Sequence, residues 1–175
     1  MDEEASMNIF FLHDEPLTAA RYNSDVHVNK MLIECCQMMS TAARKHGFVG
    51  GYRDTHVNHP MTKWVGQSNE HFQWCWTHAM GLSQEYTHRY GKTHASSRLF
   101  PALCGAMLLI PKVGWRNPPR CIPDEFKVPY DEHQGDTSCH VASYRAYYAN
   151  DKRHLHKWTK RSEPEWLADA MMVAA

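Results

Sequence analysis

The sequence predicts a mainly α-helical protein that folds as a single compact domain of three long helices, several short helices and a long proline-rich loop region. Three observations support this fold class. Apolar residues recur at helical spacing over residues 25–45, 68–90 and 138–160. Helix-capping residues precede these stretches, and Gly47 and Gly91 follow the first two. The chain of 175 residues is also long enough to enclose one sizeable core.

The N-terminal elements begin with an apolar run at residues 7–12, which predicts either a strand or an extended segment packed on the core. The acidic residues 1–6 are a possible flexible leader ahead of a natural start at Met7. Asp14-Glu-Pro16 then begins a short helix to about Tyr22, because proline is tolerated in the first helical turn.

Ser24 or Asp25 caps the first long helix, which Gly47 ends, and a glycine-rich loop leads from there to His59-Pro60. Ser68 caps the second long helix, which runs to Tyr90.

Residues 95–133 hold six of the nine prolines and show no sustained period. This composition predicts a long ordered loop region with one short helix near 103–109. A third long helix is expected from Asp136 or Ser138 to about Lys160. Ser162-Glu-Pro-Glu165 has the form of a capping box and predicts a short terminal helix.

Composition argues against several classes of protein. No apolar run approaches the roughly 20 residues that cross a bilayer, and the N-terminus lacks the order of a signal peptide. We therefore expect a cytoplasmic protein with no membrane partner. The six cysteines include no CxxC pair, so free buried thiols are favoured over disulfides. A formal net charge of +0 leaves nucleic-acid binding dependent on a local patch.

A line of polar side chains marks the first long helix. At ~100° per residue, five residues fall within an arc of about 80°; they are His27, Lys30, Glu34, Gln37 and Thr41. The rest of the helix carries few charges, so most of its surface is expected to be buried. A buried carboxylate is costly unless it is paired or lines a cleft. Two interpretations are open: a polar line along a cleft, or an exposed line with i,i+4 pairs such as Lys30 with Glu34.

The second long helix repeats this pattern, with polar side chains on one side. Each histidine taken alone is more typical of a structural group, but two polar lines in one small domain favour a shared cleft. The candidate substrate-binding residues of this cleft are Gln37, His59, Trp64, His71, His78, Glu85, Arg89 and His94. No HExxH, CxxC, Walker or dinucleotide-binding glycine pattern fixes a chemistry, and no cofactor is expected.

Basic and aromatic residues alternate near the C-terminus. The candidate nucleic-acid-binding residues are Arg145, Lys152, Arg153, Lys157, Lys160 and Arg161. The aromatic residues among them are Tyr144, Tyr147, Tyr148 and Trp158. Such a mixture suits a phosphate backbone and stacked or flipped bases, so DNA is the expected partner. Alternatively, the aromatic residues form a core face and the basic residues form a solvated face. The two interpretations can apply to different sides of the helix.

Short motifs along the chain resemble those of the phage-type pyrimidine-dimer DNA glycosylases. Asp25-Val-His27 is followed seven residues after the histidine by Glu34, behind a short apolar N-terminal segment. Further similarities are His59-Pro60 ahead of a long helix, the basic turn at residues 87–92, and the aromatic, basic stretches 144–148 and 157–158. The chain is also similar to uncharacterised tailed-phage proteins that begin Met-Asn-Ile-Phe. The resemblance implies a small helical enzyme that excises damaged bases and cleaves abasic sites, in the host cytoplasm if the protein is phage-encoded.

The resemblance also implies the catalytic residues, with one departure. The family uses a free α-amine as nucleophile, whereas six residues precede Met7 here and Asn8 after it disfavours methionine removal. Lys30, one turn before Glu34, is the natural substitute, because burial between apolar faces would favour its neutral amine and Glu34 would oppose this. Glu34 then serves as the acid–base group, and Asp25 and His27 as its orienting neighbours.

Two other functions remain open at this point, as does the oligomeric state. One is a metal-dependent enzyme of nucleotide or DNA modification. Its ligands would come from His27, Glu34, His59, His71, His78, Glu85 and His94. The other is a non-enzymatic phage protein that binds a host factor or a nucleotide through its aromatic residues.

Overall fold

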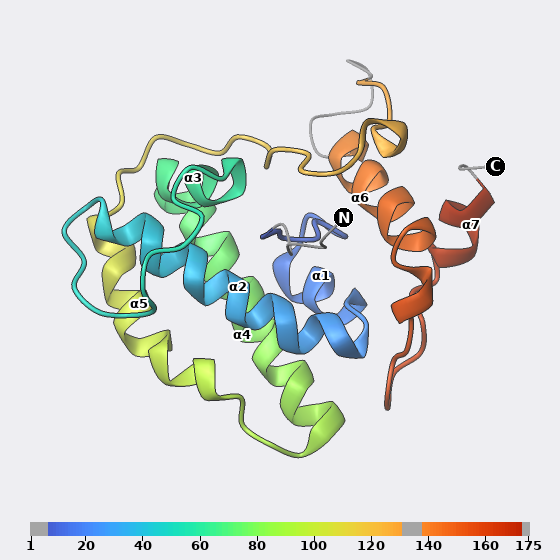
Figure 1. The fold of residues 1–175 in the computed structure, drawn as a ribbon, viewed down its shortest axis with the longest axis horizontal. Helices are drawn as coiled ribbons and strands as arrows, with labels where there is room; N and C mark the ends of the chain where they lie inside the picture. Colours follow the sequence, from blue (N-terminus) through green and yellow to red (C-terminus); the bar gives the residue numbers. More distant parts are fainter. Residues whose placement is uncertain (1–6, 131–137, 173–175) are drawn as a thin grey trace.

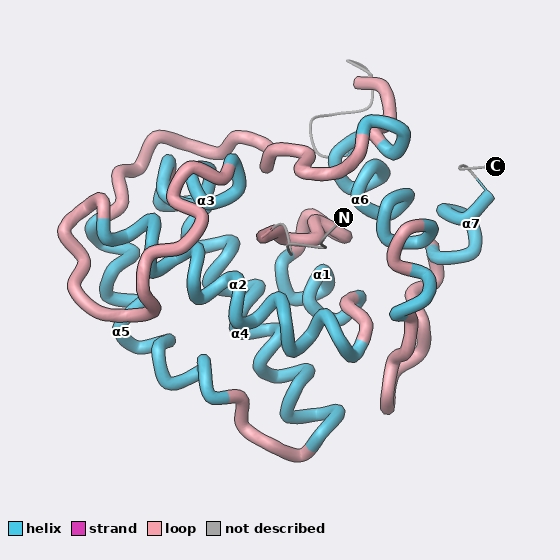
Figure 2. The backbone as a smooth tube through the Cα atoms, viewed as in Figure 1, coloured by secondary structure: helices cyan, strands magenta, loops and turns pink. Residues whose placement is uncertain are grey.

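The computed structural model describes residues 7–130 and 138–172, and within these ranges the chain forms seven α-helices, four short 3₁₀ helices and no strand. The mainly α-helical prediction is therefore confirmed. Residues 7–12 form an extended segment rather than a strand (Figure 2). The possible leader at residues 1–6 lies outside the described residues.

The two longest helices, α2 (Asp25–Arg44) and α4 (Asn69–Tyr90), pack against each other at the centre of the fold. Their predicted limits are confirmed to within a few residues. Gly91 ends α4 with a φ of 66°, a left-handed conformation that favours glycine. The short helix α1 (Pro16–Tyr22) lies on α4. A side chain at Gly81 would bring its Cβ to 2.8 Å from the Cβ of Ala20, so glycine is needed for this close approach.

The extended segment 7–12 runs between the α1–α2–α4 group and α6 (Ser138–Asn150), as Figure 1 shows. Its side chains belong to the hydrophobic core, and Phe11 and Leu12 are fully buried. A buried extended backbone must find hydrogen-bond partners outside any sheet. Here Asn8 N–H donates to Glu34 of α2, and the Leu12 carbonyl accepts from Arg145 of α6. The segment thus joins the two halves of the molecule.

Residues 60–67 form a helix, α3 (Pro60–Gln67), that was not predicted. The His59 side chain accepts a hydrogen bond from Met61 N–H, and Pro60 occupies the first turn, where it needs no N–H partner. Met61, Trp64 and Val65 then pack into the core. Eight residues are too few for a clear helical period, so the sequence pattern did not reveal the helix.

The prediction for residues 95–133 is only partly right. Residues 95–109 are helical throughout, as a 3₁₀ helix (Ala95–Leu99), α5 (Phe100–Ala106) and a second 3₁₀ helix (Met107–Leu109). Pro101 does not interrupt them because it lies in the first turn of α5. The part from residue 110 to 130 is irregular as expected, apart from a 3₁₀ turn at Asp124–Phe126.

The third long helix is shorter than predicted, since α6 ends at Asn150 rather than near Lys160. The Asn150 amide donates to the carbonyls of Ala146 and Ala170, which places the end of α6 against α7 (Leu167–Met172). After a 3₁₀ turn at Arg153–Leu155 the chain becomes irregular, with a turn near Lys160, and crosses to α1 and α2. The terminal helix is confirmed, but it begins at Leu167, after the predicted capping box.

All six cysteines are free, as predicted. Cys35, Cys36, Cys75 and Cys139 are buried, whereas Cys104 is exposed. Among the described helices none is both long and apolar enough to cross a membrane.

Candidate functional site

The polar line on α2 lies mostly inside the protein. His27, Glu34 and Thr41 are buried and Gln37 is half-buried, whereas 45% of the Lys30 side chain is exposed. The expectation that most of this helix is buried is therefore confirmed. The polar groups do not share one environment, because Asp25, His27 and Glu34 each meet a different set of partners.

Glu34 has few partners for a buried carboxylate. Its Oε2 accepts a hydrogen bond of 2.9 Å from the backbone N–H of Asn8, and its Oε1 lies 4.0 Å from Lys30 Nζ. Burial raises the pKa of Glu34 to about 7, against the smaller lowering effects of the Asn8 hydrogen bond and the Lys30 charge. At neutral pH this carboxyl is about half ionised, which suits a group that both takes and gives a proton.

Asn8 is held in place by contacts on the other side of the segment. Its amide nitrogen donates to the Cys121 carbonyl at 2.9 Å, and its Oδ1 lies 3.2 Å from the Tyr144 hydroxyl. That hydroxyl is also 2.9 Å from the Pro119 carbonyl. The N–H that meets Glu34 is therefore fixed by α6 and by the irregular loop, so the carboxylate is positioned before any substrate arrives.

Lys30 does not lie between apolar faces. Its ammonium is in contact with solvent and pairs with Glu34 only at 4.0 Å. The burial that was expected to favour a neutral amine is absent. The Lys30 side chain is instead exposed, with the buried Glu34 carboxyl as its neighbour.

His27 belongs to the core near the start of α2. Its Nδ1 lies 2.7 Å from the Tyr148 hydroxyl and 3.1 Å from Ser24 Oγ. Burial and, to a smaller extent, the neighbouring Lys152, Lys30, His156 and His154 together lower the pKa of His27 to about 3. The ring is therefore neutral at pH 7. Its hydrogen bonds hold α6 and α2 together rather than orienting Glu34.

Asp25 also lies apart from Glu34, in a buried ionic cluster formed by Asp25, Glu85, Arg89, Thr159 and Arg161. Asp25 Oδ1 accepts from Arg89 Nη1 at 3.1 Å and from Thr159 N–H at 2.9 Å, and Oδ2 accepts from the Thr159 hydroxyl at 2.6 Å. Glu85 binds Arg89 at 3.1 Å and Arg161 at 2.7 Å.

Burial alone would raise the pKa of both carboxyls in this cluster. The hydrogen bonds from Thr159 and Arg89 to Asp25, and from Arg161 and Arg89 to Glu85, lower both pKa values instead. The buried ionic cluster joins α2, α4 and the irregular C-terminal segment. The side chains of Glu85 and Arg89, two candidate substrate-binding residues, are therefore paired with other residues of this cluster.

The remaining candidate histidines each secure a local feature of the fold. His71 Nδ1 bonds the Trp64 carbonyl at 2.8 Å, its Nε2 accepts from Arg116 N–H, and its ring stacks on Trp64. His78 Nδ1 bonds the Pro16 carbonyl at 3.0 Å. His94 Nε2 bonds Asn29 Oδ1 at 2.9 Å, and His59 caps α3. None of these hydrogen bonds reaches Glu34, so these residues do not meet around it.

A metal centre was an alternative expectation for the same side chains. Within residues 7–130 and 138–172, no three His, Cys, Asp or Glu side chains are grouped in a way that could hold a metal ion.

The six basic residues near the C-terminus fall into two groups. Arg145 and Lys152 are half-buried. Arg153, Lys157, Lys160 and Arg161 are exposed, and of these Arg161 is paired with Glu85 at the edge of the buried ionic cluster. These residues lie on a turn and on the irregular segment after it, rather than on the predicted helix. Thr159 and Trp158 anchor this part of the chain to Asp25 and to the Tyr22 carbonyl.

Comparison with protein-family models, with curated proteins and with solved structures finds no match for this chain. The geometry of the site therefore carries the functional argument.

Sequence reasoning missed the part that Asn8 plays. A polar residue within the apolar run 7–12 was an available signal, since a buried polar side chain needs a partner. The identity of that partner was not available, because Glu34 lies 26 residues further along the chain.

Proposed function

We propose that this protein is a DNA-damage enzyme that excises damaged bases and cleaves the resulting abasic sites, with Glu34 as the acid–base group and Lys30 as the amine nucleophile. The observation that carries the proposal is the pairing of a buried glutamate whose pKa is about 7 with an exposed lysine amine 4.0 Å away. Perturbed carboxyl groups beside a nucleophile are typical of sites that transfer protons.

The residues suit a sequence of proton transfers in which Glu34 alternates between its two forms. Ionised Glu34 takes a proton from the Lys30 ammonium, and the free amine adds to the C1′ aldehyde of the ring-opened abasic sugar. Protonated Glu34 assists the loss of water, which leaves an imine between Lys30 and C1′. Ionised Glu34 then removes a C2′ proton, the C3′–O bond breaks, and the 3′ phosphate leaves with its electron pair. A carboxyl with a pKa of about 7 supplies both forms at neutral pH.

Positive charge near Lys30 supports DNA as the substrate. The charges of Lys152 and Lys30 both lower the pKa of His27, and His27 also hydrogen-bonds Tyr148 near the end of α6. The first turn of α2 and the end of α6 therefore lie side by side. Arg153 and Lys157, exposed in the segment after α6, suit contacts to the phosphates on either side of a flipped nucleotide.

Borohydride trapping tests the proposal. Labelled duplexes that contain one abasic site or one pyrimidine dimer are incubated with the protein and sodium borohydride, and the adduct is located by peptide mass spectrometry. We expect an adduct on Lys30, its loss in Lys30→Ala, and strand cleavage slowed about 100-fold or more in Glu34→Gln. Lys45→Ala removes an exposed lysine next to the end of the same helix and should leave both reactions unchanged.

The pH profile gives a second measurement. Because the elimination step needs ionised Glu34, cleavage should accelerate as the pH rises through about 7, and Glu34→Gln should lose this inflection. Absence of both adduct and cleavage on both duplexes would overturn the proposed function. An adduct that persists in Lys30→Ala would overturn the role of Lys30.

A further inference from the structure

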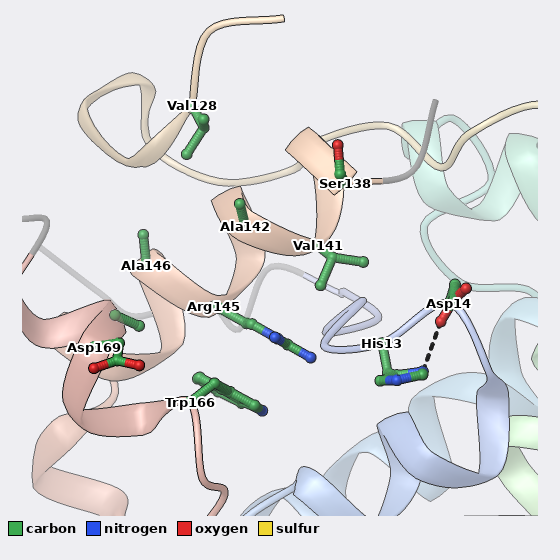
Figure 3. A pocket seen from close by; sticks show the side chains of 11 residues that line it. His13, Asp14, Val128, Ser138, Val141, Ala142, Arg145, Ala146, Trp166 and Asp169 are labelled. Atoms are coloured by element: carbon green, nitrogen blue, oxygen red, sulfur yellow. Dashed lines mark ion pairs between the residues drawn. The ribbon is translucent and has the colours of Figure 1, made fainter. Parts of the chain in front are cut away.

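A cavity of about 550 Å³ lies between α6, α7 and the turn at His13–Asp14, away from the contacts of Glu34 (Figure 3). Its volume is within the range of small-molecule sites. Much of its wall is apolar and comes from both C-terminal helices and the loop before them; these residues are Val128, Val141, Ala142, Ala146 and Ala170. Its polar side chains are Arg145, His13, Asp14, Asp169 and Ser138.

Arg145 is held rigidly in the wall of this cavity. Its Nε donates to the Leu12 carbonyl at 2.9 Å, and its guanidinium lies 4.9 Å from the Trp166 ring centre and 5.7 Å from that of Tyr22. In Figure 3 the side chain extends from α6 over Trp166 toward His13. A guanidinium fixed by stacking and by one hydrogen bond loses little entropy when it binds a ligand.

The guanidinium of Arg145 keeps unused hydrogen-bond donors in the wall of the cavity. In the described part of the chain, neither Nη1 nor Nη2 of Arg145 has a hydrogen-bond acceptor. Burial lowers the pKa of Arg145, although the charges of Tyr22, Glu165 and Asp14 act in the opposite direction. Because these donors of a half-buried guanidinium have no acceptor within the described protein, they can bind an acceptor from outside.

We propose that this cavity binds a small amphipathic monocarboxylate, whose carboxylate pairs with the free edge of Arg145 and whose apolar body lies against α6 and α7. A carboxylate matches the planar fork of a guanidinium with two parallel hydrogen bonds. A doubly charged phosphate fits less well, because Asp14 and Asp169 also border the cavity and would repel the second charge. The site uses none of the residues assigned to DNA cleavage, so it adds a ligand to the proposed function without depending on it.

Isothermal titration calorimetry with octanoate tests this inference on the full chain. Octanol has the same apolar body without the charge, and octyl phosphate replaces the carboxylate by a phosphate. We expect octanoate to bind, octanol to bind at least tenfold more weakly, and octyl phosphate to bind more weakly than octanoate. Arg145→Gln should weaken octanoate binding by about 10- to 100-fold, whereas Arg98→Gln, at an exposed arginine outside the cavity, should not.

A second variant separates loss of the site from loss of the fold. Ala142→Phe fills the cavity from α6 without removing Arg145, and it should abolish octanoate binding while the thermal unfolding temperature stays within a few degrees of that of the original protein. Equal octanoate binding by the original protein and by both cavity variants would overturn the proposal, as would no binding at millimolar octanoate. Tighter binding of octyl phosphate than of octanoate would overturn the choice of a carboxylate.

Discussion

Asp25 and Glu34 are carboxylates on the same helix, and 7% of each residue is exposed, yet their pKa values move in opposite directions. Asp25 accepts three hydrogen bonds, one of them from a fully buried arginine. Glu34 accepts a single hydrogen bond from a backbone N–H and has an exposed lysine at 4.0 Å. Equal solvent exposure therefore does not decide the charge state of a carboxyl; how deeply the group lies in the protein and the number and charge of its partners do.

This difference separates two uses of a buried carboxylate. The paired carboxyls of the buried ionic cluster hold three parts of the chain together and remain charged at neutral pH. The under-paired Glu34 is kept near its own pKa, which costs stability but makes it able to exchange a proton. Substitutions on the two sides of the comparison should therefore have opposite effects on the free energy of unfolding.

The largest effect is expected for Arg89→Met. This change leaves the Asp25 and Glu85 charges buried with fewer partners, so the free energy of unfolding at pH 7 should fall by about 3–5 kcal/mol in guanidinium denaturation. Arg53→Met, at an exposed arginine, is the matched control and should change it by less than about 0.5 kcal/mol.

The pH dependence of this loss provides a stricter test. The folded-state pKa values of Asp25 and Glu85 are lowered, so the stability they contribute is present above their unfolded pKa and is lost as the pH falls through the folded pKa. The difference between Arg89→Met and the original protein should therefore be smaller at pH 3 than at pH 7. A loss that is the same at both values would contradict the electrostatic role of the cluster.

A smaller effect of opposite sign is expected for Glu34→Gln. The folded-state pKa of Glu34 is raised, so the contribution of this group to stability is full below the unfolded pKa of 4.5 and is lost as the pH rises through the folded pKa of about 7. Glutamine keeps an oxygen for the Asn8 N–H but has no charge to bury. The variant should gain up to about 3 kcal/mol at pH 8 and almost nothing at pH 4.

Denaturant unfolding at the two pH values measures this gain. Glu163→Gln, at an exposed glutamate, serves as control and should show no comparable change. A lower free energy of unfolding for Glu34→Gln than for the original protein at pH 8 would contradict the interpretation that Glu34 is a buried carboxyl with too few partners.

The smallest effect is expected for Lys30→Met. The Lys30 charge lowers the pKa of Glu34, so its removal should raise that pKa further, by about 0.2–0.4 of a pH unit for an exposed i,i+4 pair. A titration followed by carbon NMR of the glutamate carboxyls measures the change, with Lys45→Met as control. A pKa that falls, or that does not move, would remove Lys30 from the electrostatic environment of Glu34.

The sequence by itself determined what depends on neighbours within one or two helical turns. The periods and end signals of α2 and α4 were readable, as were Pro16 at the start of α1 and the spacing that brings Lys30 next to Glu34. Each of these features is set by backbone hydrogen bonds and side chains a few residues apart. The short helix α3 was not predicted, because eight residues are too few to show a helical period.

Only the tertiary structure decided which polar groups are paired. The Asn8 N–H comes to Glu34 across 26 residues, and Thr159 comes to Asp25 across 134 residues. The same long-range contacts draw residues 156–166 away from a helical path and shorten α6. The sequence of α2 showed only a line of polar residues. A pKa depends on burial and on partners in space, so the tertiary structure alone distinguishes Asp25, which anchors the fold, from Glu34, the candidate acid–base group.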